Sequence, residues 1–237
     1  TSTLRSTGTT TLRGGTNIAF AGGSFSSAGT LAMHDNSRIE LTNGANKSMR
    51  VGGLSMSDIS VIDVSDNFMI VEYSGASPLQ SIRSYVLDGY NVGNWLGIGL
   101  RSATAAVNPL SGLGYAEASV PLGLSGGIFR GQPVDGTTVL VAYTFKGDAD
   151  INGIVNSIDF NLLQSGYGIK DGTAVWSQGD FDYNGKVNTL DFNSLAGNFG
   201  QTLASPLPGA ELGAVVPEPF SLTMLLGLFA MTRRRSR

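Results

Sequence analysis

Two twelve-residue segments carry nearly the same pattern of polar residues, and they constrain the fold of this chain more than any other feature. The first, residues 148–159, reads Asp-Ala-Asp-Ile-Asn-Gly-Ile-Val-Asn-Ser-Ile-Asp. The second, residues 180–191, begins 32 residues later and reads Asp-Phe-Asp-Tyr-Asn-Gly-Lys-Val-Asn-Thr-Leu-Asp. The copies agree at segment positions 1, 3, 5, 6, 8, 9 and 12, and Phe-Asn follows both. An internal duplication of one loop-forming unit is therefore indicated.

The spacing of oxygen-bearing residues in both segments is typical of a calcium loop. Calcium takes about six to eight oxygen ligands, and a 12-residue loop supplies them from positions 1, 3, 5, 7, 9 and 12. Positions 7 would contribute backbone carbonyls, positions 9 would ligate directly or through water, and glycine at position 6 allows the sharp turn. The predicted ligands are Asp148, Asp150, Asn152, Ile154, Asn156 and Asp159, then Asp180, Asp182, Asn184, Lys186, Asn188 and Asp191.

A simpler interpretation is that these Asp, Asn and Gly residues only form turns. Two observations favour metal binding over that alternative. The copies are in register, and an apolar, helix-like face follows each of them, around Phe160 and Phe192. We therefore predict two structural Ca²⁺ ions.

The predicted arrangement of the loops resembles a known module. An expected strand over 138–145, rather than a helix, precedes the first loop, so each loop with its following helix forms half an EF-hand. The segment 146–201 resembles a dockerin. The resemblance implies two loop–helix units packed with pseudo-twofold symmetry, and we expect Trp176 to pack between them.

The dockerin resemblance also implies a partner-binding face. In that family a cohesin partner is recognised at loop positions 10 and 11, and the hydroxyls at position 10 fit the pattern. The following helices carry Gln164-Ser165 and Ala196-Gly197 where dockerins often have a basic pair. The residues assigned to this face are Ser157, Ile158, Thr189 and Leu190.

Residues 1–145 are predicted to form a mainly β region. Short apolar strings alternate with Gly, Asn and Ser, which suits a β-solenoid or a sandwich. The strings lie at 11–13, 17–20, 38–41, 59–64 and 69–71. Thr-Leu-Arg recurs at 3–5 and 11–13 without a sustained period. These Gly- and Thr-rich strands are similar to the passengers of autotransporter-associated β-repeat proteins. The resemblance implies a β-helix.

One helix is expected within this β region, over about 78–88. Ser77-Pro78 provides an N-cap and a proline at the first helical position, and Gly89 provides a stop.

The C-terminal end differs in composition from the rest. Residues 202–215 read as a linker, and 216–237 contain an apolar run that predicts one short helix. This end resembles a PEP-CTERM sorting signal, through Pro217, Glu218, Pro219, Arg233, Arg234 and Arg235. The resemblance implies export, transient anchoring in the inner membrane, processing by an exosortase-type enzyme, and delivery to the cell envelope or outside. A disordered apolar end or a poor tail anchor is the alternative.

Because the sequence begins at Thr1, we expect a piece of a longer export precursor.

The remaining sequence favours a non-catalytic role. No basic stripe lies outside the tail and the formal charge is −3, so no nucleic-acid partner is expected. Residues 123–127 match Gly-x-Ser-x-Gly, but His34, the only histidine, precedes them, against the chain order of that hydrolase fold. Carboxylate pairs among Glu40, Asp63, Glu72 and Glu117 stay open as a glycosidase alternative.

We therefore predict a secreted or cell-surface structural and interaction protein that is not an enzyme. Two alternatives belong to other classes. The first is an adaptor that docks a polysaccharide-degrading or adhesive passenger onto a cohesin-like partner. The second is the C-terminal part of a glycoside-active enzyme whose catalytic domain lies elsewhere.

Overall fold

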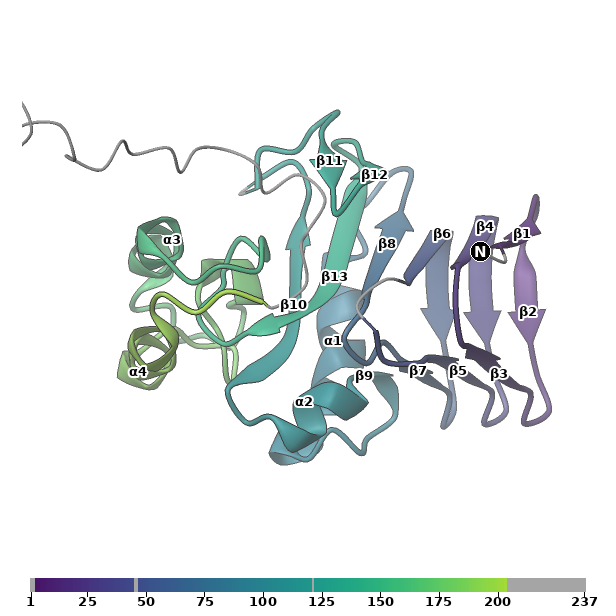
Figure 1. Cartoon of the computed structure of the whole chain (residues 1–237), viewed down its shortest axis with the longest axis horizontal. Coiled ribbons are helices and arrows are strands. Elements are labelled where there is room, and N and C mark those ends of the chain that lie inside the picture. The colour runs from purple at the N-terminus through teal and green to yellow at the C-terminus, as the bar shows by residue number, and fades with distance from the viewer. Residues whose placement is uncertain (1–2, 45–46, 121, 204–237) are drawn as a thin grey trace, which may run out of the picture.

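The computed structural model describes residues 3–44, 47–120 and 122–203 (Figure 1). The linker beyond 203 and the tail with Pro217–Pro219 and Arg233–Arg235, including the helix expected there, lie outside the described residues. In the part of the chain that is described, no helix is long and apolar enough to cross a membrane.

The N-terminal half is a β-solenoid of about three turns, formed by two parallel sheets (Figure 1). This confirms the prediction of a mainly β, solenoid-like region. One sheet contains β1 (Thr3–Ser6), β2 (Thr10–Leu12), β4 (Ser24–Met33), β6 (Ser48–Met56) and β8 (Phe68–Glu72). The other contains β3 (Asn17–Phe20), β5 (Arg38–Leu41), β7 (Val61–Asp63) and β9 (Gly99–Arg101).

Stacked apolar side chains hold the rungs of the solenoid together. Successive side chains of a strand point to opposite faces, so alternate residues can face the interior. On one side Phe25, Met49 and Met69 occupy the same register position of β4, β6 and β8, and each is buried. On the other side Ile39, Ile62 and Leu100 form an equivalent buried stack.

After the third turn the first sheet changes from parallel to antiparallel pairing. Strand β13 (Thr138–Phe145) pairs antiparallel with β8, and β10 (Ser111–Glu117) pairs antiparallel with β13. The strand predicted over 138–145 is therefore confirmed. Strand β10 lies at the end of the sheet, where it has β13 as its only strand partner among the described residues.

Helix α1 (Leu79–Tyr90) is inserted between β8 and β9, where the sequence predicts a helix over about 78–88. The predicted N-cap is displaced by one residue, because Pro78 occupies the N-cap position and the helix begins at Leu79; the Ser77 hydroxyl still accepts a hydrogen bond from the Leu79 amide at 3.1 Å. The expected stop at Gly89 is wrong, because the helix continues to Tyr90 and Asn91 ends it with a φ of 43°. Gly89 instead permits close packing, since a Cβ there would lie 1.8 Å from the Leu100 carbonyl oxygen.

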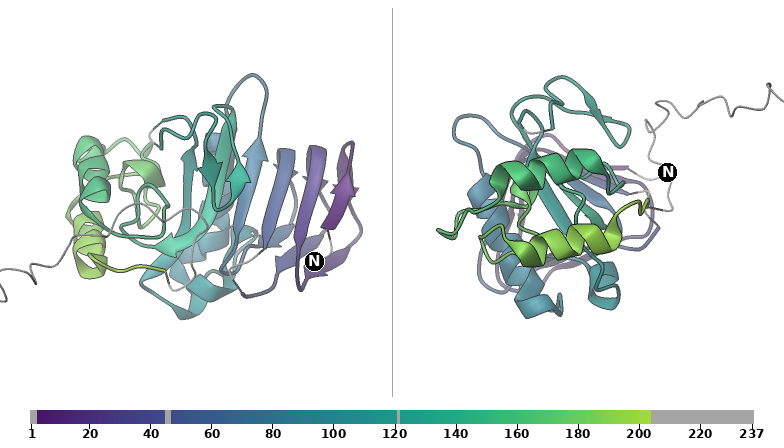
Figure 2. Two further views of the ribbon diagram at one scale, coloured as in Figure 1. Left: turned by 45° about the horizontal axis from the view of Figure 1, so that its top comes forward. Right: turned by 90° about the vertical axis from the view of Figure 1, so that its left-hand side faces the viewer.

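Seven further elements complete the part of the chain that the structure describes. They are η1 (Asn91–Gly93), α2 (Ala103–Val107), β11 (Ile128–Phe129), β12 (Gln132–Pro133), α3 (Ser157–Gly166), η2 (Trp176–Gln178) and α4 (Thr189–Asn198). Helices α3 and α4 lie side by side beyond β10 (Figure 2).

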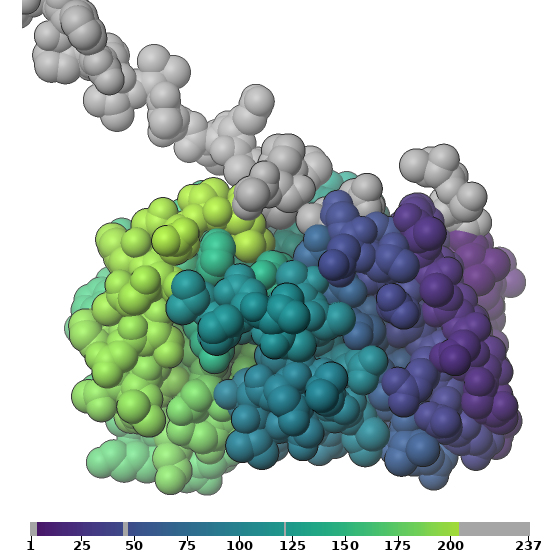
Figure 3. Space-filling model, turned by 60° about the horizontal axis from the view of Figure 1, so that its bottom comes forward, coloured from purple at the N-terminus to yellow at the C-terminus, as the bar shows by residue number. Residues whose placement is uncertain are grey.

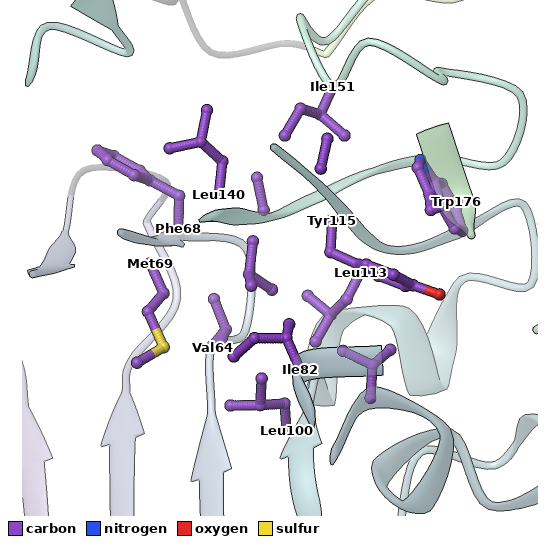
Figure 4. Close-up of a cluster of buried hydrophobic side chains, with 14 of the residues drawn as sticks. Val64, Phe68, Met69, Ile82, Leu100, Leu113, Tyr115, Leu140, Ile151 and Trp176 are labelled. Atoms are coloured by element: carbon purple, nitrogen blue, oxygen red, sulfur yellow. The ribbon is translucent and has the colours of Figure 1, made fainter. Parts of the chain in front are cut away.

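The β region and residues 146–201 share one hydrophobic core. Leu113, Tyr115 and Leu140 from the strands belong to the same buried cluster as Ile151 and Trp176 (Figure 4). In the space-filling view the yellow-green C-terminal part and the teal β part form one continuous surface (Figure 3). The conformation of residues 146–201 is therefore linked to that of the sheet.

Candidate metal centres

Two groups of three aspartates lie at the end of the sheet. In each group one carboxylate oxygen per residue lies within 4.8 Å of the others. Asp148, Asp150 and Asp159 form the first group, and Asp180, Asp182 and Asp191 form the second. The structure therefore brings together the six aspartates that the sequence predicts as ligands.

The same hydrogen bonds shape both loops. At position 5, the backbone amide donates to the position-3 carboxylate, at 3.1 Å in each copy. The position-7 amide then donates to the position-5 side chain at 2.8 Å, from Ile154 to Asn152 and from Lys186 to Asn184. Side-chain oxygens thus accept hydrogen bonds from the backbone amides of the turn. As a result, each loop winds around its own carboxylates, which lie at its centre.

The position-12 aspartates close the loops. Asp191 accepts the amides of Phe181 and Asn188, both at 2.9 Å. Asp159 accepts the amides of Ala149 and Asn156, both at 2.8 Å. Each carboxylate is fully buried and bridges the beginning and the end of its loop.

The position-9 asparagines begin the two helices. The Asn156 side-chain oxygen accepts the Ile158 amide at 2.7 Å, and the Asn188 oxygen accepts the Leu190 amide at 2.8 Å. Both complete a capping box with the position-12 aspartate. Because each asparagine oxygen already accepts a hydrogen bond, it would coordinate a metal ion through its remaining lone pair or through a water molecule.

The two loop–helix units exchange backbone hydrogen bonds. Val187 of the second loop pairs with Gly168 and Ile169, which follow the first helix. Val155 of the first loop pairs with residues 200 and 201, which follow the second helix. Each loop is therefore held by the chain that leaves the other helix.

Trp176 lies between the loops, as the sequence predicts. Its indole nitrogen donates to the Asp148 carbonyl oxygen at 2.7 Å. Its ring contacts Phe181 and Tyr183 of the second loop, with centroid distances of 5.1 and 5.4 Å. The packing extends further than expected, because the same indole also lies against Gly112 and Gly114 of β10.

Burial dominates the electrostatics of the two carboxylate groups. Removal from water, with repulsion from neighbouring carboxylates, raises the pKa of Asp180 to about 7 and that of Asp159 to about 6. Burial also raises the pKa of Asp148 well above its ordinary value, and it raises the pKa values of Asp150 and Asp191. The folded chain thus places negative charges where they are poorly solvated.

One carboxylate oxygen in the second group has no hydrogen-bond partner among the described residues. Asp180 is fully buried; its Oδ2 accepts the Gly185 amide at 2.8 Å, but its Oδ1 accepts nothing. A buried polar atom without a partner costs about 1–3 kcal/mol. The equivalent oxygen of Asp148 accepts the Asn152 amide at 3.1 Å. The orphaned oxygen fits a cation held between Asp180, Asp182 and Asp191.

These pKa shifts predict how stability changes with pH when no metal ion is bound. The folded pKa of Asp180 is about 7 against an ordinary value of 3.8, so the native state binds more protons than the unfolded state between these values. Stability should therefore fall as pH rises from about 4 to about 7. Thermal unfolding in EDTA at a series of pH values measures this, and a melting temperature that rises over that window would contradict it.

The residues assigned to a partner face are all exposed. Ser157 and Thr189 begin the two helices. Ile158 and Leu190 are 55% and 61% exposed. The half-exposed rings of Phe160 and Phe192 meet edge to face beside them, at a centroid distance of 6.4 Å.

The motif at 123–127 lies in a turn between β10 and β11, and the next described elements are short strands rather than a helix. The strand–turn–helix context of a nucleophile elbow is therefore missing.

His34 Nδ1 lies 2.7 Å from the Ser57 hydroxyl. Glu40 is exposed. The other candidate carboxylates have partners: Asp63 pairs with Arg101, Glu72 with Arg50, and Glu117 accepts the Tyr73 hydroxyl.

Two contacts of the loops have no signal in the sequence pattern. The Thr144 hydroxyl of β13 donates to the Asp148 carboxylate. Tyr183, at the non-ligand position 4, hydrogen bonds to β10 through its hydroxyl. The pattern places ligands only within the loops, so it gives no reason to look for partners in the sheet.

Comparisons with protein-family models, with curated proteins and with solved structures gave no match to this chain.

Proposed function

We propose that this chain is a non-catalytic secreted or cell-surface protein in which two loops bind structural calcium ions. The observation that carries the proposal is the buried Asp180 oxygen without a partner, inside a group of three carboxylates that occurs twice. One cation in each group would offset the repulsion between its carboxylates, so the binding free energy of both ions would add to the stability of the fold.

The donor set favours calcium over other cations. The side-chain donors are carboxylate and amide oxygens, and the chain has no cysteine. Such oxygens suit Ca²⁺, Mg²⁺ and Mn²⁺ rather than thiophilic or imidazole-binding metals. Magnesium keeps several waters in a strict octahedron, whereas calcium accepts many protein oxygens in a flexible loop. The first ion would be held by the predicted ligands of 148–159 and the second by those of 180–191.

Calorimetric titration of the whole chain with Ca²⁺ tests the proposal. We expect two sites for the native sequence and one site each for Asp150→Ala and Asp182→Ala, which remove the half-buried ligand at position 3 of one loop. Asp171→Ala is the matched control, since Asp171 is an exposed turn residue outside the loops. Absence of binding at millimolar Ca²⁺ would overturn the proposal.

The proposed location rests on the sequence of the tail. A segment with Pro-Glu-Pro, an apolar run and three consecutive arginines suits export and processing by an exosortase-type enzyme, with Arg233–Arg235 on the cytoplasmic side. Replacing Pro217–Pro219 by alanines should leave the precursor unprocessed in the membrane fraction. Normal processing of that variant would argue against a sorting role.

A second candidate function is an adaptor that docks onto a cohesin-like partner. It is favoured by the exposed apolar side chains of Ile158 and Leu190, which occupy equivalent positions of the two helices. Binding of the native chain to a purified cohesin domain, with and without calcium, decides between an adaptor and a purely structural protein. The Ile158→Asp/Leu190→Asp double variant is the control for this face.

A further inference from the structure

Strand β10 has one edge that no other described strand covers. On its other side it pairs with β13, with Leu113 opposite Tyr143. At the uncovered edge the Leu113 amide donates to the Tyr183 hydroxyl at 2.9 Å, and this hydroxyl donates to the Leu113 carbonyl at 3.2 Å. One side chain from the second loop thus satisfies both backbone groups that Leu113 presents there.

The backbone of both loops is strained at the residue that reaches the sheet. Position 4 is Ile151 in the first loop and Tyr183 in the second, with φ values of 52° and 62°. A positive φ is unfavourable for a non-glycine residue, and most of all for a β-branched one. Both side chains are nevertheless buried, at 0% and 2% exposure. Contacts with the sheet must therefore offset the strain.

Glycines in β10 make room for these two side chains. A Cβ at Gly112 would lie 2.4 Å from the Tyr183 hydroxyl oxygen, and one at Gly114 would lie 2.3 Å from Cγ2 of Ile151. Ile151 belongs to the same buried cluster as Trp176 and the strand residue Leu113 (Figure 4). Two glycines, separated by one residue, thus admit the position-4 residues of two different loops.

We propose that Tyr183 couples the second metal loop to the free edge of the sheet, so that calcium in this loop controls the protection of β10. The inference rests on the proposed calcium binding. Tyr183 stands between Asp182 and Asn184, whose positions depend on the winding of the loop. Without a cation the buried carboxylates repel each other, which favours opening of the loop and withdrawal of the hydroxyl. An unprotected edge then presents open hydrogen-bonding groups.

Amide hydrogen exchange of the whole chain, with calcium and in EDTA, measures this coupling. Calcium removal should speed exchange of the Leu113 amide by roughly tenfold, the effect of about one hydrogen bond. The amide of Ile70, in the central strand β8, is the internal reference. In Tyr183→Phe, which keeps the ring, Leu113 should exchange fast whether or not calcium is present. Tyr167→Phe is the matched control, because Tyr167 is 53% exposed.

Calorimetry on the same variants separates the inference from the proposed function. Coupling is reciprocal, so Tyr183→Phe should still bind two calcium ions but bind the second-loop ion more weakly, by the factor seen in exchange. If two ions bind and Leu113 exchange is the same with and without calcium, the coupling is overturned and the calcium sites stand. If no ion binds, the proposed function fails and the coupling fails with it.

Discussion

Replacing Trp176 by alanine should lower the free energy of unfolding by about 3–5 kcal/mol, the usual cost of removing a large buried aromatic side chain. Trp176 is fully buried, and its ring contacts Phe181 and Tyr183. Its indole nitrogen holds the Asp148 carbonyl oxygen at the start of the first loop. The substitution therefore removes packing from the shared core and leaves one carbonyl without its donor.

Urea unfolding followed by circular dichroism measures the effect of Trp176→Ala. Tyr167→Ala is the control, because this exposed residue should change stability by no more than about 0.5 kcal/mol. The strand signal and the helix signal should be lost in one transition, since both regions contribute to one core. A variant that loses the helices while the strands unfold at the native midpoint would contradict this expectation.

Asp191→Ala should destabilise the chain even without calcium. It leaves the amides of Phe181 and Asn188 without an acceptor, which we expect to cost about 2–6 kcal/mol, given about 1–3 kcal/mol for each donor. In calcium at 100 times the dissociation constant, the loss of the second site removes about 2.7 kcal/mol more. Unfolding midpoints in EDTA and in calcium separate the two contributions.

Asp191→Asn separates loop closure from metal binding. Its side chain keeps one oxygen acceptor and removes a buried charge, so in EDTA it should be more stable than Asp191→Ala. It should still lose the calcium-dependent part of the stability, because charge at position 12 is needed for the ion. If both variants gained the native stabilisation from calcium, Asp191 would not be a ligand.

The sequence predicted the local features of this structure well. Strands over 17–20, 38–41 and 138–145 form as expected, because alternating or continuous apolar residues have few other ways to be buried. The six loop aspartates come together because their turn hydrogen bonds lie within twelve residues of chain. Whether the loops hold calcium stays a prediction.

The solenoid period was not visible in the sequence for a physical reason. Paired positions run from Thr3 to Ser24, then to Ser48 and Phe68, so successive turns differ by several residues. In the second sheet Val61 pairs with Gly99, because the α1 segment is inserted in between. Backbone pairing requires matching strands but tolerates unequal turns, and a search for a fixed repeat fails for that reason.

Long-range contacts at the loops were also missed. Tyr183 and Leu113 are 70 residues apart, and neither is unusual for its segment. Gly112 and Gly114 resemble the many other glycines of this chain, although Tyr183 and Ile151 of the loops lie directly against them. Such contacts depend on how two elements meet in space, which no local pattern records.

Because the rungs stack in parallel, the length of the solenoid can change without any change in the two acidic loops. Each rung contacts only its neighbours, as in other solenoid proteins. Inserting or deleting a rung between β4 and β6 would change the reach of the molecule in steps of about 4.8 Å, the spacing of adjacent strands. The loop-bearing end would keep the same contacts with β10. The number of rungs could thus set how far the N-terminal end of the solenoid lies from the loop-bearing end without any change in the loops.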